Sequence, residues 1–66
     1  MKLIVNGESM DVDTATTAHA LIVHLGLTGR RIAMELNGDI LPRSTHASHR
    51  FTDGDRVEIV HAVGGG

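Results

Sequence analysis

Residues 53–66 read DGDRVEIVHAVGGG, which is a turn signal, a β-strand pattern and a run of three glycines. Asp53-Gly54 is typical of a tight turn, and the alternation that follows predicts a strand with Val57 and Ile59 facing a core. The outward face of this strand would carry Arg56, Glu58, Val60 and Ala62. Glycine loses more backbone entropy on ordering than any other residue. The sequence therefore predicts a folded domain over residues 1–62 and a flexible tail over residues 63–66.

The glycine tail suggests a chain end that reacts inside another protein. A backbone without Cβ atoms can enter a channel too narrow for other residues, so Gly64 and Gly65 would thread into a partner and present the carboxylate of Gly66. At roughly 3.5 Å per residue, four tail residues reach about 14 Å. Taken alone, a terminal glycine run is equally typical of a linker left by cloning or of a frayed end without a role.

Length and composition narrow the classes of function. A chain of 66 residues makes one small domain and buries only about 60% of its unfolded surface, which leaves little room for an enclosed catalytic cleft. The absence of cysteine excludes disulfides, thiolate metal sites and a cysteine nucleophile. A net charge of −2 and a single aromatic residue, Phe51, argue against nucleic acid as a partner.

No apolar run approaches the roughly 20 residues of a membrane helix, so no membrane association is expected. Met1 leads directly into a strand pattern, without the basic and apolar regions of a signal peptide. We therefore expect a cytoplasmic protein.

The rest of the chain alternates between strand and helix signals. Asn6-Gly7 predicts a two-residue hairpin turn between strands at residues 2–5 and 8–13, with Ile4 on the face opposite to the core. Apolar residues at i, i+3, i+4 and i+7 predict a helix over residues 17–25, ended by Gly26. The apolar residues of this stripe are Ala18, Leu21, Ile22 and Leu25.

Two further strands precede the last one. Residues 31–37 alternate, Asn37-Gly38 predicts a second tight turn, and residues 39–41 form a short strand that Pro42 ends. Residues 43–50 are polar and irregular, with room for one turn of 3₁₀ helix. The order predicts an α+β fold: a mixed sheet of four to five strands, with one helix packed across one face and the first and last strands parallel in the middle.

Four segments together resemble a known family. They are LIVNG at residues 3–7, LNGDILPR at residues 36–43, DGDRVEIV at residues 53–60, and the terminal glycines. In this order and spacing, the chain resembles the ubiquitin-like β-grasp sulfur carriers, specifically the thiamine-biosynthesis sulfur carriers. Members of that family end in Gly-Gly, which Gly65 and Gly66 match, and the resemblance covers essentially the whole chain.

The resemblance implies a carrier that is not itself an enzyme and binds no cofactor. A ubiquitin-activating-like adenylyltransferase would use ATP to adenylate Gly66, a sulfur donor protein would supply the sulfur of a thiocarboxylate, and thiazole synthase would receive it. Adenylation is chemically reasonable because a terminal carboxylate, with a pKa near 3.5, is anionic at neutral pH and resists nucleophiles.

A partner would also need to bind a surface of this chain near the tail. We predict a small apolar patch made of Ile4, Val60, Ala62 and Val63, although isolated surface aliphatics are normal in any protein. We expect all five histidines at the surface and no metal site, because His19 and His24 are five residues apart and point in different directions on the helix.

Three other functions remain open from the sequence. The small subunit of molybdopterin synthase shares the fold and the terminal Gly-Gly. A ubiquitin-like interaction module or protein modifier would have a tail that is not sulfurated. A small enzyme is disfavoured, since no constellation of catalytic residues is evident.

Overall fold

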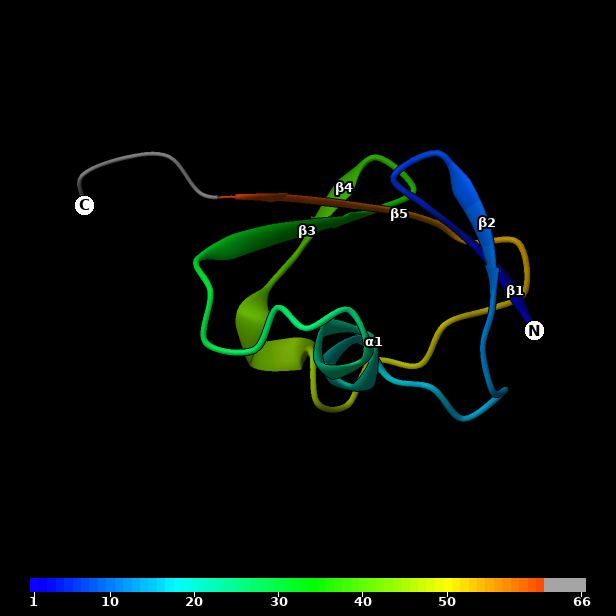
Figure 1. The fold of residues 1–66 in the computed structure, drawn as a ribbon, viewed down its shortest axis with the longest axis horizontal. Coiled ribbons are helices and arrows are strands. Elements are labelled where there is room, and N and C mark those ends of the chain that lie inside the picture. The colour runs from blue at the N-terminus through cyan, green and yellow to red at the C-terminus, as the bar shows by residue number, and fades with distance from the viewer. Residues whose placement is uncertain (62–66) are drawn as a thin grey trace.

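The computed structural model describes residues 1–61, which form one five-stranded sheet and one α-helix (Figure 1). The elements in chain order are β1 (Lys2–Val5), β2 (Glu8–Asp11), α1 (Ala18–His24), β3 (Ile32–Leu36), β4 (Asp39–Leu41), the 3₁₀ helix η1 (Arg43–Thr45) and β5 (Arg56–His61). The predicted tail at residues 63–66, and the predicted domain boundary at residue 62, lie outside the described residues.

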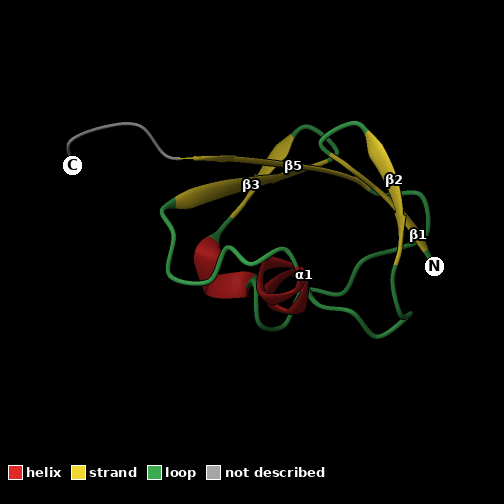
Figure 2. Cartoon of the chain, in the orientation of Figure 1, coloured by secondary structure: helices red, strands yellow, loops and turns green. Residues whose placement is uncertain are grey.

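The sheet order is β2-β1-β5-β3-β4, with β5 in the centre. β1 and β5 run parallel, whereas every other neighbouring pair is antiparallel. The helix α1 and the short η1 lie on the same side of the sheet, and the opposite face has no helix over it within the described residues (Figure 2). The predicted α+β architecture, with the first and last strands parallel in the middle, is confirmed.

Both Asn-Gly pairs form the predicted tight turns. Asn6 and Gly7 have φ values of 49° and 85°, and Asn37 and Gly38 have φ values of 50° and 90°. Two successive positive φ values are the requirement of a type I′ turn, and asparagine and glycine meet it at the lowest steric cost. These turns set the registers of the two hairpins on either side of β5.

The core lies between α1 and the sheet. The helix begins after Thr17, whose Oγ1 accepts a hydrogen bond from the Ala20 N–H at 3.1 Å. It ends before Gly26, which has the predicted left-handed φ of 73°. The largest fully buried side chains come from three strands and the helix: Leu3, Leu21, Met34 and Val57. The helix has only seven residues, so its packing on the sheet is what stabilises it.

The prediction that all histidines lie at the surface is wrong for His46, which is 7% exposed. The Nε2–H of His46 donates to the Leu41 carbonyl at 3.1 Å, which satisfies the polar ring inside the protein. His49 is half-buried and meets Phe51 edge to face, with 5.3 Å between the ring centroids. The physical reason is that the 43–50 segment packs on the start of α1: the N–H groups of Ala18 and His19 donate to the carbonyls of His49 and His46.

Candidate functional site

The strand β5 leads to the C-terminal glycines, and its neighbours change along its length. β1 pairs only with its first two residues, through Ile4 opposite Arg56 and Val5 opposite Val57. β3 pairs with its last five residues, ending with Ile32 opposite His61. The end of β5 is thus held by β3, on the side of the molecule away from the N-terminus (Figure 1).

The side chains of the two turn asparagines form hydrogen bonds to β5 at two different positions along the strand. Asn6 Oδ1 accepts a hydrogen bond from the Ile59 N–H at 2.8 Å, just beyond the point where β1 stops pairing. Asn37 Oδ1 accepts from the Arg56 N–H at 2.9 Å, and its Nδ2 donates to Asp55 Oδ1 at 3.1 Å. These side-chain bonds add to the backbone hydrogen bonds of the sheet. They hold β5 in place at Arg56 and Ile59.

Around the end of β5, the face of the sheet away from the helix is partly apolar. Val60 is 51% exposed and lies opposite Ala33 of β3. Ile40 of β4, 64% exposed, lies opposite Glu35 on the same face. A shallow hollow of about 480 Å³ adjoins Val60 and is otherwise lined by polar residues and glycine: Glu35, Asn37, Gly38, Arg56 and Glu58.

The predicted patch residues are not all brought together. Ile4 shares the outer face with Val60, but it lies opposite Arg56, four residues earlier on β5. Ala62 and Val63 lie outside the described residues, as do Gly64, Gly65 and Gly66. Ala33 and Ile40, which are not among the predicted patch residues, lie on the same face as Val60 according to the register. The alternation of residues 31–37 puts Ala33 and Glu35 on one face of a strand, but only the register shows which strand Ala33 adjoins.

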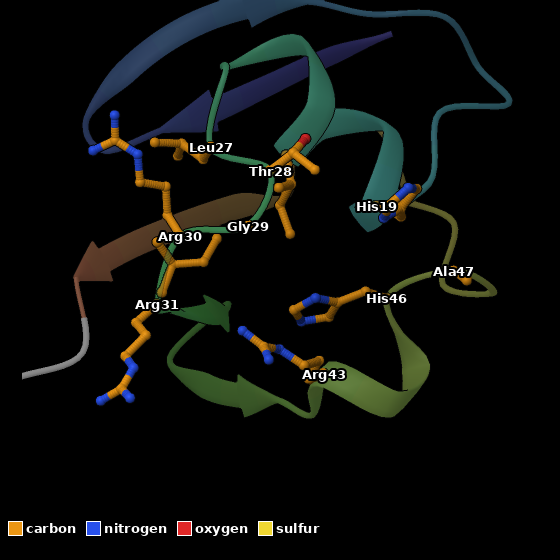
Figure 3. Close-up of a pocket in the computed structure, with 11 residues that line it drawn as sticks. His19, Leu27, Thr28, Gly29, Arg30, Arg31, Arg43, His46 and Ala47 are labelled. Carbon is orange, nitrogen blue, oxygen red and sulfur yellow. The ribbon is translucent and has the colours of Figure 1, made fainter. Parts of the chain in front are cut away.

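A second feature lies on the helix side of the same strand end. A pocket of about 350 Å³ is bounded by α1, the loop from Leu27 to Arg31, and the segment from Arg43 to Ala47 (Figure 3). Ile32, the strand partner of His61, also lines it. The outer apolar face and this pocket therefore flank the same end of β5.

Within residues 1–61, no group of three or more histidine or acidic side chains is arranged to hold a metal ion. In the same part of the chain, no helix is long and apolar enough to cross a membrane. The chemistry expected from the sequence concerns the chain end beyond His61, which lies outside the described residues.

Comparison with solved structures gives the class of protein. The fold is similar to the crystal structure of the thiamine biosynthesis protein ThiS from Geobacter metallireducens, with a TM-score of 0.83 and 35% sequence identity over the whole of both chains. The five-stranded sheet with one helix is thus the β-grasp architecture of a ThiS-type protein.

The profile of the ThiS family matches residues 3–66, and the chain belongs to this family. Over its full length it is 29% identical to the full-length sulfur carrier protein ThiS of Escherichia coli strain K12. It is also 42% identical, over all 66 residues, to part of a thiazole synthase from Paramagnetospirillum magneticum. The chain spans about a fifth of the length of that relative, and also of a second thiazole synthase, from Magnetococcus marinus, with 33% identity.

Proposed function

We propose that Gly66 is the group that carries sulfur: an adenylyltransferase activates its carboxylate with ATP, and a sulfur donor protein converts the acyl adenylate to a thiocarboxylate. The first step breaks the bond between the α- and β-phosphates of ATP and releases pyrophosphate. The carboxylate oxygen becomes bonded to the α-phosphorus in that step. Hydrosulfide delivered by the sulfur donor then forms a C–S bond at the carbonyl carbon while the bond from that carbon to the AMP oxygen breaks, so AMP leaves and a thiocarboxylate remains. Membership of the ThiS family is the observation that supports this proposal, together with the Gly65-Gly66 end that the sequence supplies.

The thiocarboxylate would then donate its sulfur to thiazole synthase. Support comes from the two relatives named thiazole synthase, in which a segment similar to this whole chain forms part of a longer protein. Two activities joined in one polypeptide are often partners when they are separate. A protein that works with such partners is expected in the cytoplasm.

We further propose that the partners hold the outer face at the end of β5. Val60 and Ile40 are among the three large hydrophobic residues that are most exposed within residues 1–61. Ala33, which lies opposite Val60 on β3, adds a small apolar side chain to this surface. Arg56 and Glu58 supply a polar rim. Interfaces commonly combine an apolar centre with such a rim. Ile4, Ala62 and Val63 remain proposed members of this surface.

A pyrophosphate-exchange assay tests the proposed role of Gly66. The chain would be mixed with the adenylyltransferase of its own organism, ATP and labelled pyrophosphate, and compared with a variant lacking Gly66 and with Gly66→Ala. The wild-type chain should support exchange, and both variants should lose most of it while keeping their circular dichroism spectra. Normal exchange with the shortened chain would show that Gly66 is not the modified residue.

A further inference from the structure

The pocket beside the end of β5 gathers positive charge in a protein with a net charge of −2. Three of the six Lys and Arg residues of the chain and two of its five histidines line it, and no aspartate or glutamate does. The basic residues are His19, Arg30, Arg31, Arg43 and His46. Because they come from three separate segments, the fold and not the local sequence concentrates them.

The arginines of this pocket lie on opposite rims. Figure 3 shows the Arg43 side chain and the His46 ring directed into the space between η1 and the loop from Leu27 to Arg31. Arg30 and Arg31 stand on the other rim, and their side chains point outward from it. Within residues 1–61, the side chains of Arg30 and Arg43 make no hydrogen bond or ion pair. Guanidinium groups with unused donors are suited to carboxylates, which they can bind through two parallel N–H···O bonds.

The His46 ring forms a fixed wall of the pocket. It is buried, and its Nε2–H is engaged with the Leu41 carbonyl, so the ring cannot turn without losing that bond. Its backbone carbonyl also accepts the His19 N–H at 2.9 Å, which ties the 43–47 segment to α1. The position of Arg43, three residues earlier on η1, is thereby set by the core.

We propose that this basic pocket, made of His19, Arg30, Arg43 and His46, binds a carboxylate-bearing acidic segment of the adenylyltransferase that acts on the C-terminus. The inference rests on the function proposed above. The location of the pocket favours a protein segment over a small free anion as its ligand. Ile32 lines the pocket and pairs with His61 at the end of β5, and the adenylyltransferase must approach this end of the strand. The spread of the arginines over two rims fits several carboxylates along a chain better than one compact ion.

The test uses charge reversal with a matched control. Arg43→Glu and Arg30→Glu each place an acid in the pocket, and Arg43→Gln removes the charge without reversing it. Arg50→Glu makes the same change of charge at an exposed arginine that does not line the pocket. The dissociation constant for the adenylyltransferase would be measured by calorimetry at low and at raised salt, after thermal unfolding has shown that each variant is folded.

We expect Arg43→Glu and Arg30→Glu to weaken binding about tenfold or more, Arg43→Gln less, and Arg50→Glu by under about threefold. The salt dependence of binding should also be shallower for the pocket variants. At saturating enzyme, pyrophosphate exchange should return to the wild-type rate, since the pocket holds the partner and takes no part in the chemistry. Equal affinities for Arg43→Glu, Arg30→Glu and Arg50→Glu would overturn the inference.

Two further results separate the possible failures. If inorganic phosphate at sub-millimolar concentration shifts the pocket amides in NMR spectra to saturation, while Arg43→Glu binds the enzyme as Arg50→Glu does, the pocket serves a free anion and the inference is wrong. If the wild-type chain neither binds the enzyme nor supports exchange, the proposed function fails, and the inference falls with it.

Discussion

The side chain of Asn6 accepts a hydrogen bond from the backbone N–H of Ile59, 53 residues later in the chain, at 2.8 Å. The same residue supplies a positive φ of 49° to the first hairpin turn. Asn37 repeats the arrangement from the second hairpin, accepting from the Arg56 N–H at 2.9 Å. Each asparagine therefore shapes its own turn and also fastens the strand that leads to Gly66.

The double role of Asn6 can be separated by substitution. Asn6→Gly keeps the positive φ but removes the acceptor, whereas Asn6→Asp retains an acceptor oxygen. We expect Asn6→Gly to lower the free energy of unfolding by about 1–2 kcal/mol, because the partly buried Ile59 N–H loses its partner. Asn6→Ala should lower it further through backbone strain, and Asn6→Asp should lower it least. Urea unfolding measures all three, and a glycine variant as stable as the wild type would show that the bond contributes nothing.

Gly38 is predicted to be needed for its backbone conformation alone. Its φ is 90°, and a Cβ built on it meets nothing within 4 Å, so a side chain would cause strain without a clash. Gly38→Ala should therefore lower the free energy of unfolding by about 1–2 kcal/mol. The matched control is Gly38→D-Ala, made by chemical synthesis, because a D-residue favours positive φ. Equal losses from the L- and D-alanine variants would contradict this explanation.

His46 should contribute to stability as a buried hydrogen-bond donor. His46→Leu fills a similar volume but leaves the Leu41 carbonyl without its donor, so we expect a loss of about 1–3 kcal/mol in the free energy of unfolding. His24→Leu, at an exposed position of α1, is the control and should change stability by less than about 0.5 kcal/mol. If both variants unfold at the same urea concentration, the buried ring has no special role.

Val60 and Val23 offer a matched pair for the outer face. They are 51% and 52% exposed, but Val23 lies on α1, on the other side of the sheet. Val60→Arg should weaken binding to the adenylyltransferase about tenfold or more, because a charge enters the apolar centre of the proposed interface. Val23→Arg should leave the affinity nearly unchanged. Similar affinities for the two variants would place the interface elsewhere.

The order and type of the elements were predictable because their signals are local. The two Asn-Gly turns, the helical spacing from Ala18 to Leu25 and the alternation of β5 each act over a few residues. The burial of His46 was not predictable, since it depends on the 43–50 segment packing against the start of α1. A histidine in a polar stretch carries no sign of that contact.

The candidate site was predictable only in part, for the same reason. Alternation placed Ile4 and Val60 on one face, but the offset between β1 and β5 sets them four residues apart along β5. That offset comes from the pairing of two strands distant in the chain, which neither strand shows alone. The basic pocket likewise draws residues from three segments whose proximity arises only on folding.

The central claim is that the chain end at Gly66 carries sulfur, and intact-mass spectrometry of the protein isolated from its native host tests it most directly. With sulfur available, the account predicts a species heavier than the unmodified chain by the difference between a sulfur and an oxygen atom. Fragmentation should place this increase on Gly66, and it should be absent when the adenylyltransferase is deleted. A chain that remains wholly unmodified while the host is making thiamine would contradict the account.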